Sequence, residues 1–179
     1  MARRLVLIRH AKAEGAHPRG DHERALTDRG VVAAVELGRW LSGQGLAPDH
    51  VLVSTAVRTR QTLDGLVRGL GSADLDAAGA ASRTWEDRRV YDGGIDGVLA
   101  AVTETPEEAD VVWVVGHEPV MSTSTWELCG ADGMPDGLRE ELAGGFPTAT
   151  AAVLEADEVW RALGFGAARL VALHTARSD

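Results

Sequence analysis

Short apolar runs alternate along the chain with longer segments that mix apolar and polar residues. Three of the runs are continuous, as in strands buried on both faces of a sheet, and they predict strands over 5–8, 51–53 and 111–115. In the longer segments apolar residues recur with helical spacing, which predicts helices over 31–41, 57–70, 95–103 and 120–129. Two last strands are predicted over 148–154 and 168–173.

Capping and turn residues set the limits of these elements. Thr27 is a suitable N-cap for the first long helix, and Gly43 and Gly45 end it. Ser54 and Thr55 close the second strand and are predicted to cap the helix that follows. The remaining segments are predicted to be loops over 17–24, 71–81 and 130–137, with a short strand within 85–91.

The alternation of buried strands and helices predicts an α/β fold, a three-layer α/β/α sandwich with a mostly parallel central sheet. The chain has no internal repeat and no linker long enough to divide it, so residues 1–179 are predicted to form a single domain.

Composition narrows the classes of partner. The 179 residues carry a net charge of −9, which disfavours nucleic acid as a partner. The first apolar run is too short for a signal sequence or a membrane span. Cys129 is the only cysteine, so no internal disulfide can form, which fits the reducing cytoplasm. We therefore expect a cytoplasmic protein without a membrane partner.

Polar residues of one chemical kind follow three of the predicted strands. Arg9 and His10 follow the first strand, Arg58 comes just after the second, and His117 follows the third. In open α/β sheets, ligands bind outside the carboxyl ends of the strands. Guanidinium groups match phosphate oxygens, and helix N-termini add N–H donors, so we expect these residues to converge on a phosphoryl group.

Two histidines in such a pocket divide the chemistry. A neutral imidazole nitrogen can attack phosphorus, while the second histidine stays protonated as a donor to the phosphoryl oxygens. This chemistry requires neither a metal nor a cofactor. His17 and His22 lack further ligands at metal-binding spacing, so no metal site is predicted, and both are expected in a loop at the edge of the pocket.

Four segments, in order, resemble the signatures of the histidine phosphatase superfamily, whose members are phosphoglycerate-mutase-like. Residues 7–12 (LIRHAK) resemble the "RHG" signature in the form seen in its SixA-type phosphohistidine phosphatase branch. Residues 24–30 (RALTDRG), 54–62 (STAVRTRQT) and 115–119 (VGHEP) are similar to the family's "RPLTxxG", "SPxxRAxQT" and "VGHNP" stretches. The resemblance implies that His10 is the nucleophile and that Arg9, Arg58 and His117 hold the phosphoryl oxygens.

The chain departs from the family pattern at three positions. Thr55 stands for a proline, which should loosen the turn after the second strand without changing the register of Arg58. Glu118 stands for asparagine and Ala11 for glycine. Ser54 is expected to shape its turn rather than to react.

The proton donor is left open between three alternatives. Many superfamily members carry a carboxylate in an "LxE" context, where this chain has Asp92. Another branch places an acid directly after the second histidine, where Glu118 stands. SixA-type enzymes use no dedicated acid, because the ring of a phosphohistidine leaving group can carry its own proton.

The sequence thus predicts a metal-independent phosphatase that acts through a phosphohistidine intermediate. A SixA-like protein phosphohistidine phosphatase is favoured over a small-molecule phosphomonoesterase, because only the stretch 71–81 is long enough to cover the pocket and it is poor in apolar residues. A non-catalytic phosphate-binding regulatory module is the alternative of another class. Lys12 is a possible substrate contact, although a surface lysine is the simpler interpretation.

Overall fold

A computed structural model describes residues 2–71 and 82–177. Six strands form one sheet in the order β3-β2-β4-β1-β5-β6. The strands are β1 (Arg3–Arg9), β2 (His50–Val53), β3 (Thr84–Glu86), β4 (Val111–Gly116), β5 (Thr150–Ala156) and β6 (Ala168–Thr175). Strands β3, β2, β4 and β1 are mutually parallel, whereas β5 and β6 run antiparallel to their neighbours.

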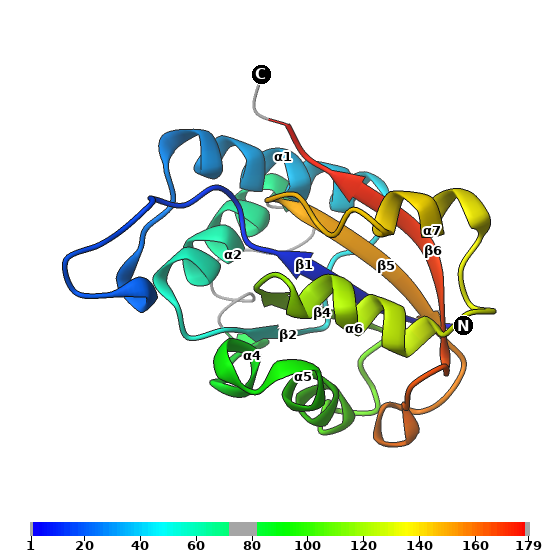
Figure 1. Cartoon of the computed structure of the whole chain (residues 1–179). Helices are drawn as coiled ribbons and strands as arrows, with labels where there is room; N and C mark the ends of the chain where they lie inside the picture. Colours follow the sequence, from blue (N-terminus) through cyan, green and yellow to red (C-terminus); the bar gives the residue numbers. More distant parts are fainter. Residues whose placement is uncertain (1, 72–81, 178–179) are drawn as a thin grey trace.

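Helices cover both faces of this sheet (Figure 1). On one face lie α1 (Asp28–Gly43) and α2 (Val57–Leu70), and on the other lie α4 (Arg89–Asp92), α5 (Gly94–Thr103), α6 (Val120–Cys129) and α7 (Asp136–Leu142). Short 3-10 helices occur at Asp21–Glu23 (η1) and Trp160–Ala162 (η2). The predicted mostly parallel α/β/α architecture is therefore confirmed.

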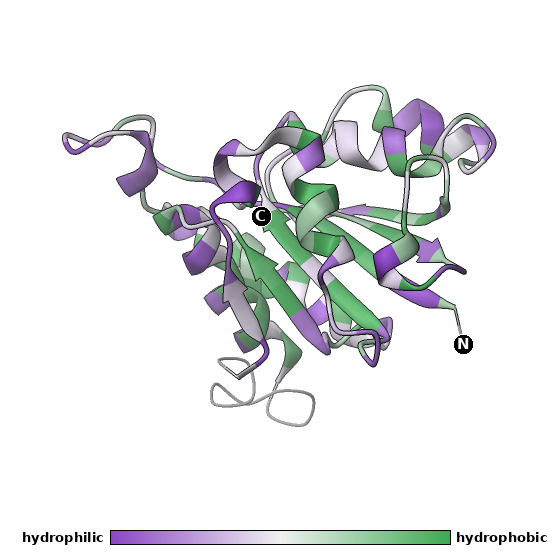
Figure 2. Cartoon of the chain, turned by 90° about the horizontal axis from the view of Figure 1, so that it is seen from below, coloured by the Kyte–Doolittle hydropathy of each residue, from purple (hydrophilic) through white to green (hydrophobic). Residues whose placement is uncertain are grey.

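The core has two parts, one on each side of the sheet. Val6 and Ile8 of β1 point toward α1 and α2, whereas Leu5 and Leu7 point toward α5 and α6, as alternation along a strand requires. All four side chains are buried. Figure 2 shows hydrophobic residues along the central strands of the sheet, whereas the helices mix hydrophobic and hydrophilic residues.

Several local expectations need correction. Helix α7 lies where a loop and unassigned residues were expected, since its polar sequence offers only Leu138 and Leu142 as a weak apolar stripe. The segment 85–91 contains the end of β3 and then the start of α4. Neither Ser54 nor Thr55 is the N-cap of α2; that position belongs to Ala56, which makes no side-chain capping bond.

Other expectations are confirmed. Thr27 is the N-cap of α1 and accepts a hydrogen bond from the Gly30 amide. The long predicted helices are all present, with boundaries shifted by a few residues. Of the predicted loop over 71–81, all but Gly71 lies outside the described residues. None of the described helices is long and apolar enough to cross a membrane.

Candidate active site

The carboxyl ends of three parallel strands bring the predicted site residues to one edge of the sheet. Arg9, the last residue of β1, pairs with Gly116 at the end of β4. Val53, the last residue of β2, pairs with Val115. His10, Ser54 and His117 are the next residues along these strands, so the sheet register itself places them together.

His10 is buried as a neutral imidazole. The residue is only 8% exposed, and its Nδ1 lies 2.7 Å from the Ala11 carbonyl oxygen, which can only accept a hydrogen bond. The proton is therefore on Nδ1, and Nε2 keeps its lone pair. Burial lowers the pKa of His10 to about 4, and the nearby charges of Arg58 and Arg9 act in the same direction. Near pH 7 this ring has the protonation state of a nucleophile.

His117 is fixed through both ring nitrogens. Its Nε2 lies 2.7 Å from Ser54 Oγ, and its Nδ1 accepts a hydrogen bond from Arg58 Nη2 at 3.1 Å. Desolvation lowers the pKa of His117 to about 3, and the charge of Arg58 contributes. The second histidine was expected to stay protonated. It is neutral instead, because burial beside a guanidinium disfavours a second positive charge.

Arg58 is held by an acidic residue that the sequence analysis did not select. Asp21 Oδ2 accepts from Arg58 Nη2 at 2.9 Å, and the Asp21 carbonyl accepts from Nη1 at 2.7 Å. Arg24 Nη1 also donates to this carboxylate, at 2.8 Å. The bond from Arg24, and then that from Arg58, lowers the pKa of Asp21 to about 2, so the carboxylate stays ionised. The only sequence signal was the spacing of three between Asp21 and Arg24.

Arg9 is oriented by the segment before β5. It donates to the Phe146 carbonyl, while the Phe146 amide donates to Glu118 Oε1 at 2.9 Å. Glu118 also accepts from the hydroxyl and the amide of Ser122. Because β5 is antiparallel to β1, its start lies at the same edge as the end of β1, and Thr148 also reaches the site. The direction of β5 could not be read from its apolar pattern.

These groups enclose a polar cavity of about 360 Å³. Its lining contains every predicted site residue except Asp92, together with groups from the 13–24 segment and the loop before β5: Arg9, His10, Lys12, Ala13, Asp21, Arg24, Arg58, His117, Glu118 and Thr148. Among these described residues are the guanidinium groups of Arg9, Arg24 and Arg58 and the amine of Lys12, so the cavity concentrates basic side chains in a chain whose net charge is −9.

Asp92 lies apart from this cavity. Its Oδ2 accepts from Arg88 Nε at 2.9 Å within the same short helix, and its side chain is about half exposed. The preceding residue, Tyr91, faces the site instead: its ring lies 5.4 Å from that of His117, and its hydroxyl donates to Asp21 Oδ2 at 3.3 Å. The expected position of Asp92 in the site is therefore not observed.

His22 does not line the cavity but lies next to residues of the site. Its Nε2 lies 3.0 Å from Thr55 Oγ1, and its ring lies 5.0 Å from that of Tyr91. Thr55, which stands for the family's proline, thus ties the start of α2 to the 17–24 loop. In the described part of the chain, no group of three His, Cys, Asp or Glu side chains could hold a metal ion.

Comparison with known proteins places this site in a family. The sequence profile of the histidine phosphatase superfamily (branch 1) matches residues 5–80. An uncharacterised protein of Mycobacterium tuberculosis, Rv1276c, is 33% identical over 172 residues, which cover 95% of this chain and all of that protein.

Solved structures of similar proteins indicate the same family. A protein from Nakamurella multipartitia, provisionally assigned as phosphohistidine phosphatase SixA, is 35% identical with a TM-score of 0.81, covering 98% of this chain and 97% of that one. The protein histidine phosphatase SixA complexed with tungstate shares the fold, with a TM-score of 0.75 at 23% identity over 96% of both chains.

The fold and the paired histidines among arginines at the strand ends define the class, and the chain belongs to the histidine phosphatase superfamily. Within it, the neighbours support a phosphatase.

Proposed function

We propose that this protein is a SixA-like phosphohistidine phosphatase, which moves the phosphoryl group of a phosphorylated protein onto His10 and then to water. The observation that carries the proposal is the state of His10. It is a buried, neutral imidazole whose Nδ1–H is bonded to the Ala11 carbonyl, leaving the Nε2 lone pair for attack in a cavity rich in guanidinium groups.

In the first step His10 Nε2 forms a bond to phosphorus as the bond from phosphorus to the substrate nitrogen breaks. The leaving imidazole carries a proton on its other nitrogen, so it departs neutral without a proton from the enzyme. In the second step water attacks phosphorus, inorganic phosphate leaves, and neutral His10 is restored. Arg9 and Arg58 balance the charge on the phosphoryl oxygens in both transition states.

Arg58 must exchange partners when substrate enters. Its two terminal nitrogens are bonded to Asp21 in the free protein, and a phosphoryl dianion competes for the same donors. The incoming negative charge also raises the pKa of His117, because an opposite charge favours the imidazolium form. His117 can then donate to a phosphoryl oxygen although it is neutral in the free protein.

The surroundings of the carboxylates favour the acid-free alternative. Asp92 is bonded to Arg88 outside the cavity. Glu118 already accepts hydrogen bonds from Ser122 and from the Phe146 amide, so its oxygens are engaged in holding the segment before β5. Asp21 stays ionised beside two arginines. A substrate whose leaving group needs no enzymatic proton suits this site better than an alkyl phosphate does.

The test compares turnover of a phosphohistidine peptide with turnover of a panel of phosphorylated metabolites. We expect the ratio kcat/KM to be highest for the phosphohistidine peptide. A metabolite that is turned over orders of magnitude better would favour the small-molecule phosphomonoesterase. Absence of turnover with every substrate, in protein that still binds phosphate, would favour the regulatory module.

A further inference from the structure

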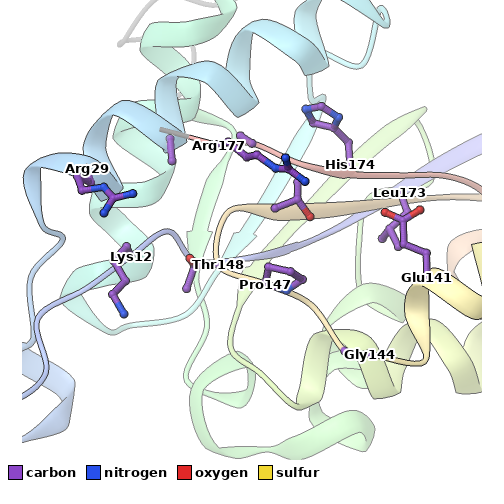
Figure 3. Close-up of a pocket in the computed structure, with 13 residues that line it drawn as sticks. Lys12, Arg29, Glu141, Gly144, Pro147, Thr148, Leu173, His174 and Arg177 are labelled. Carbon is purple, nitrogen blue, oxygen red and sulfur yellow. The ribbon is translucent and has the colours of Figure 1, made fainter. Parts of the chain in front are cut away.

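A second, larger hollow opens beside the catalytic cavity (Figure 3). Its volume is about 960 Å³, and it shares Lys12 and Thr148 with the catalytic cavity. We call it the side groove and define it by Lys12, Arg29, Glu141, Pro147, His174 and Arg177. Its residues come from the segment after β1, the start of α1, helix α7 and the loop that follows it, and the end of β6 with the residues just after it.

The charge of the side groove is opposite to that of the whole molecule. Among the described residues that line it are the basic side chains of Lys12, Arg29 and Arg177 and one carboxylate, that of Glu141. Figure 3 shows Lys12 and Arg29 on the side of the hollow away from Glu141. In a chain with 18 basic and 27 acidic residues, such a cluster is a focused attraction for anions.

A further hollow adjoins the side groove. This shallow hollow shares His174, Thr175 and Arg177 with it and extends to Trp40 and Val32 on α1. The ring of His174 stacks on that of Trp40 at 4.4 Å, and Val32 is 49% exposed. Three hollows that share lining residues therefore follow one another from the His10 cavity to the surface of α1, an arrangement that suits an extended polypeptide.

From this continuity and charge we propose that the side groove binds an acidic segment of the phosphorylated protein, next to the residue whose phosphoryl group enters the His10 cavity. The inference rests on the proposed function and adds its substrate preference. Carboxylates of the segment lie against Arg29 and Arg177, and apolar residues farther along it reach Val32 and Trp40.

The experiment measures kcat/KM for two phosphohistidine peptides, one with Asp and Glu beside the phosphohistidine and one with Asn and Gln in their place. Free phosphoramidate serves as a substrate without a segment. Arg177→Glu and Arg29→Ala are compared with Arg161→Glu. Arg161 is 72% exposed on η2, whose neighbour Trp160 packs in the core on the other side of the sheet from α1.

For the wild type we expect the acidic peptide to be preferred, with a preference that falls as salt is raised. Arg177→Glu should lower kcat/KM for the acidic peptide on the order of tenfold, mainly through KM, because charges at the rim of an interface act on association. Arg29→Ala should act in the same direction. Turnover of phosphoramidate should be unchanged in both variants, and Arg161→Glu should match the wild type with all substrates.

Three results would overturn the inference. Equal kcat/KM of Arg177→Glu and wild type for the acidic peptide would remove the groove from substrate binding while leaving the proposed function intact. Phosphorylated metabolites that bear a second anionic group are assayed with the same variants, and a loss of kcat/KM in Arg177→Glu for these metabolites alone would assign the groove to small molecules. If wild type hydrolyses phosphoramidate but neither peptide, the proposed function fails, and the inference fails with it.

Discussion

His10 shows how one residue acquires its chemistry from its surroundings. The Ala11 carbonyl selects the tautomer, and burial removes the charge. In the sequence, His10 follows one predicted strand, and Arg58 and His117 follow two others. This placement was enough to predict that the three residues form one site. Tautomer and protonation depend on contacts that a sequence does not list, and this is why the neutral state of His117 was not foreseen.

The buried neutral state of His10 has a consequence for stability. Its pKa in the folded protein, about 4, lies below the usual 6.5 of the unfolded chain, so the unfolded state binds more protons between these values. The contribution to stability is therefore complete above pH 6.5 and is lost as the pH falls toward 4.

We expect wild type to lose about 2 kcal/mol more unfolding free energy than His10→Asn when the pH is lowered from 7 to about 4.5. Urea unfolding of both proteins at the two pH values measures the difference. The carboxylates are common to both proteins, so their effect cancels. Equal losses would mean that His10 is charged in the folded state.

The two candidate acids can be separated by leaving group. Asp92→Asn should change turnover less than about twofold with both an alkyl phosphate and p-nitrophenyl phosphate, because Asp92 is bonded to Arg88 away from the cavity. Glu118→Gln should slow both substrates by the same factor, about tenfold, since Glu118 positions the Phe146 segment that holds Arg9.

A loss of rate that is larger for one of the two substrates would contradict this prediction. If either variant slows the alkyl phosphate far more than p-nitrophenyl phosphate, whose leaving group needs no proton, that carboxylate is the acid. A general loss of folded enzyme would slow both substrates equally, so comparing the two substrates in one variant controls for it.

At the scale of elements, the site depends on how closely α1 approaches the segment after β1. A Cβ atom on Gly30 would lie 2.1 Å from the Lys12 carbonyl oxygen, which also accepts a hydrogen bond from the Thr27 amide at 2.9 Å. Helix α2 holds the same segment, since Thr62 Oγ1 accepts from the Ala11 amide at 3.1 Å. These contacts explain why glycine and threonine occupy these positions in the motifs.

Gly30→Ala should destabilise the protein by about 2–3 kcal/mol, because the added methyl group meets backbone that cannot rotate away. It should also reduce activity by displacing the segment after His10. The control is Gly43→Ala at the end of α1, where nothing lies within 4 Å of the added atom and stability should change by less than about 1 kcal/mol. Equal unfolding free energies for Gly30→Ala and wild type would refute the close approach.

The elements also show which parts of the fold are readable from the chain. Strands β1, β2 and β4 were predictable because continuous apolar runs ended in polar residues. The loop before β5 was not, since Phe146 and Thr148 enter the site only because β5 runs antiparallel to β1. Helix α7 was not predicted, because its packing depends on two leucines in an otherwise polar stretch.

At the scale of the whole molecule, an acidic protein gathers fixed cations at one cavity. Arg9, Arg24 and Arg58 place three guanidinium groups around it, which match the oxygens of a phosphoryl group. We expect activity to survive chelators, and vanadate or tungstate to inhibit competitively by occupying the same donors. Loss of activity in EDTA that a divalent ion restores would contradict this prediction.

The central claim is that His10 carries the phosphoryl group, and trapping the intermediate tests it most directly. Wild type is quenched during turnover of a substrate labelled in its phosphoryl group, and the labelled peptide is identified, with His10→Ala as the control. The account predicts acid-labile, base-stable label on His10 of the wild type, and no label and no turnover in His10→Ala, which should still bind phosphate through Arg9 and Arg58. Label on His117, or near-normal turnover by His10→Ala, would contradict it.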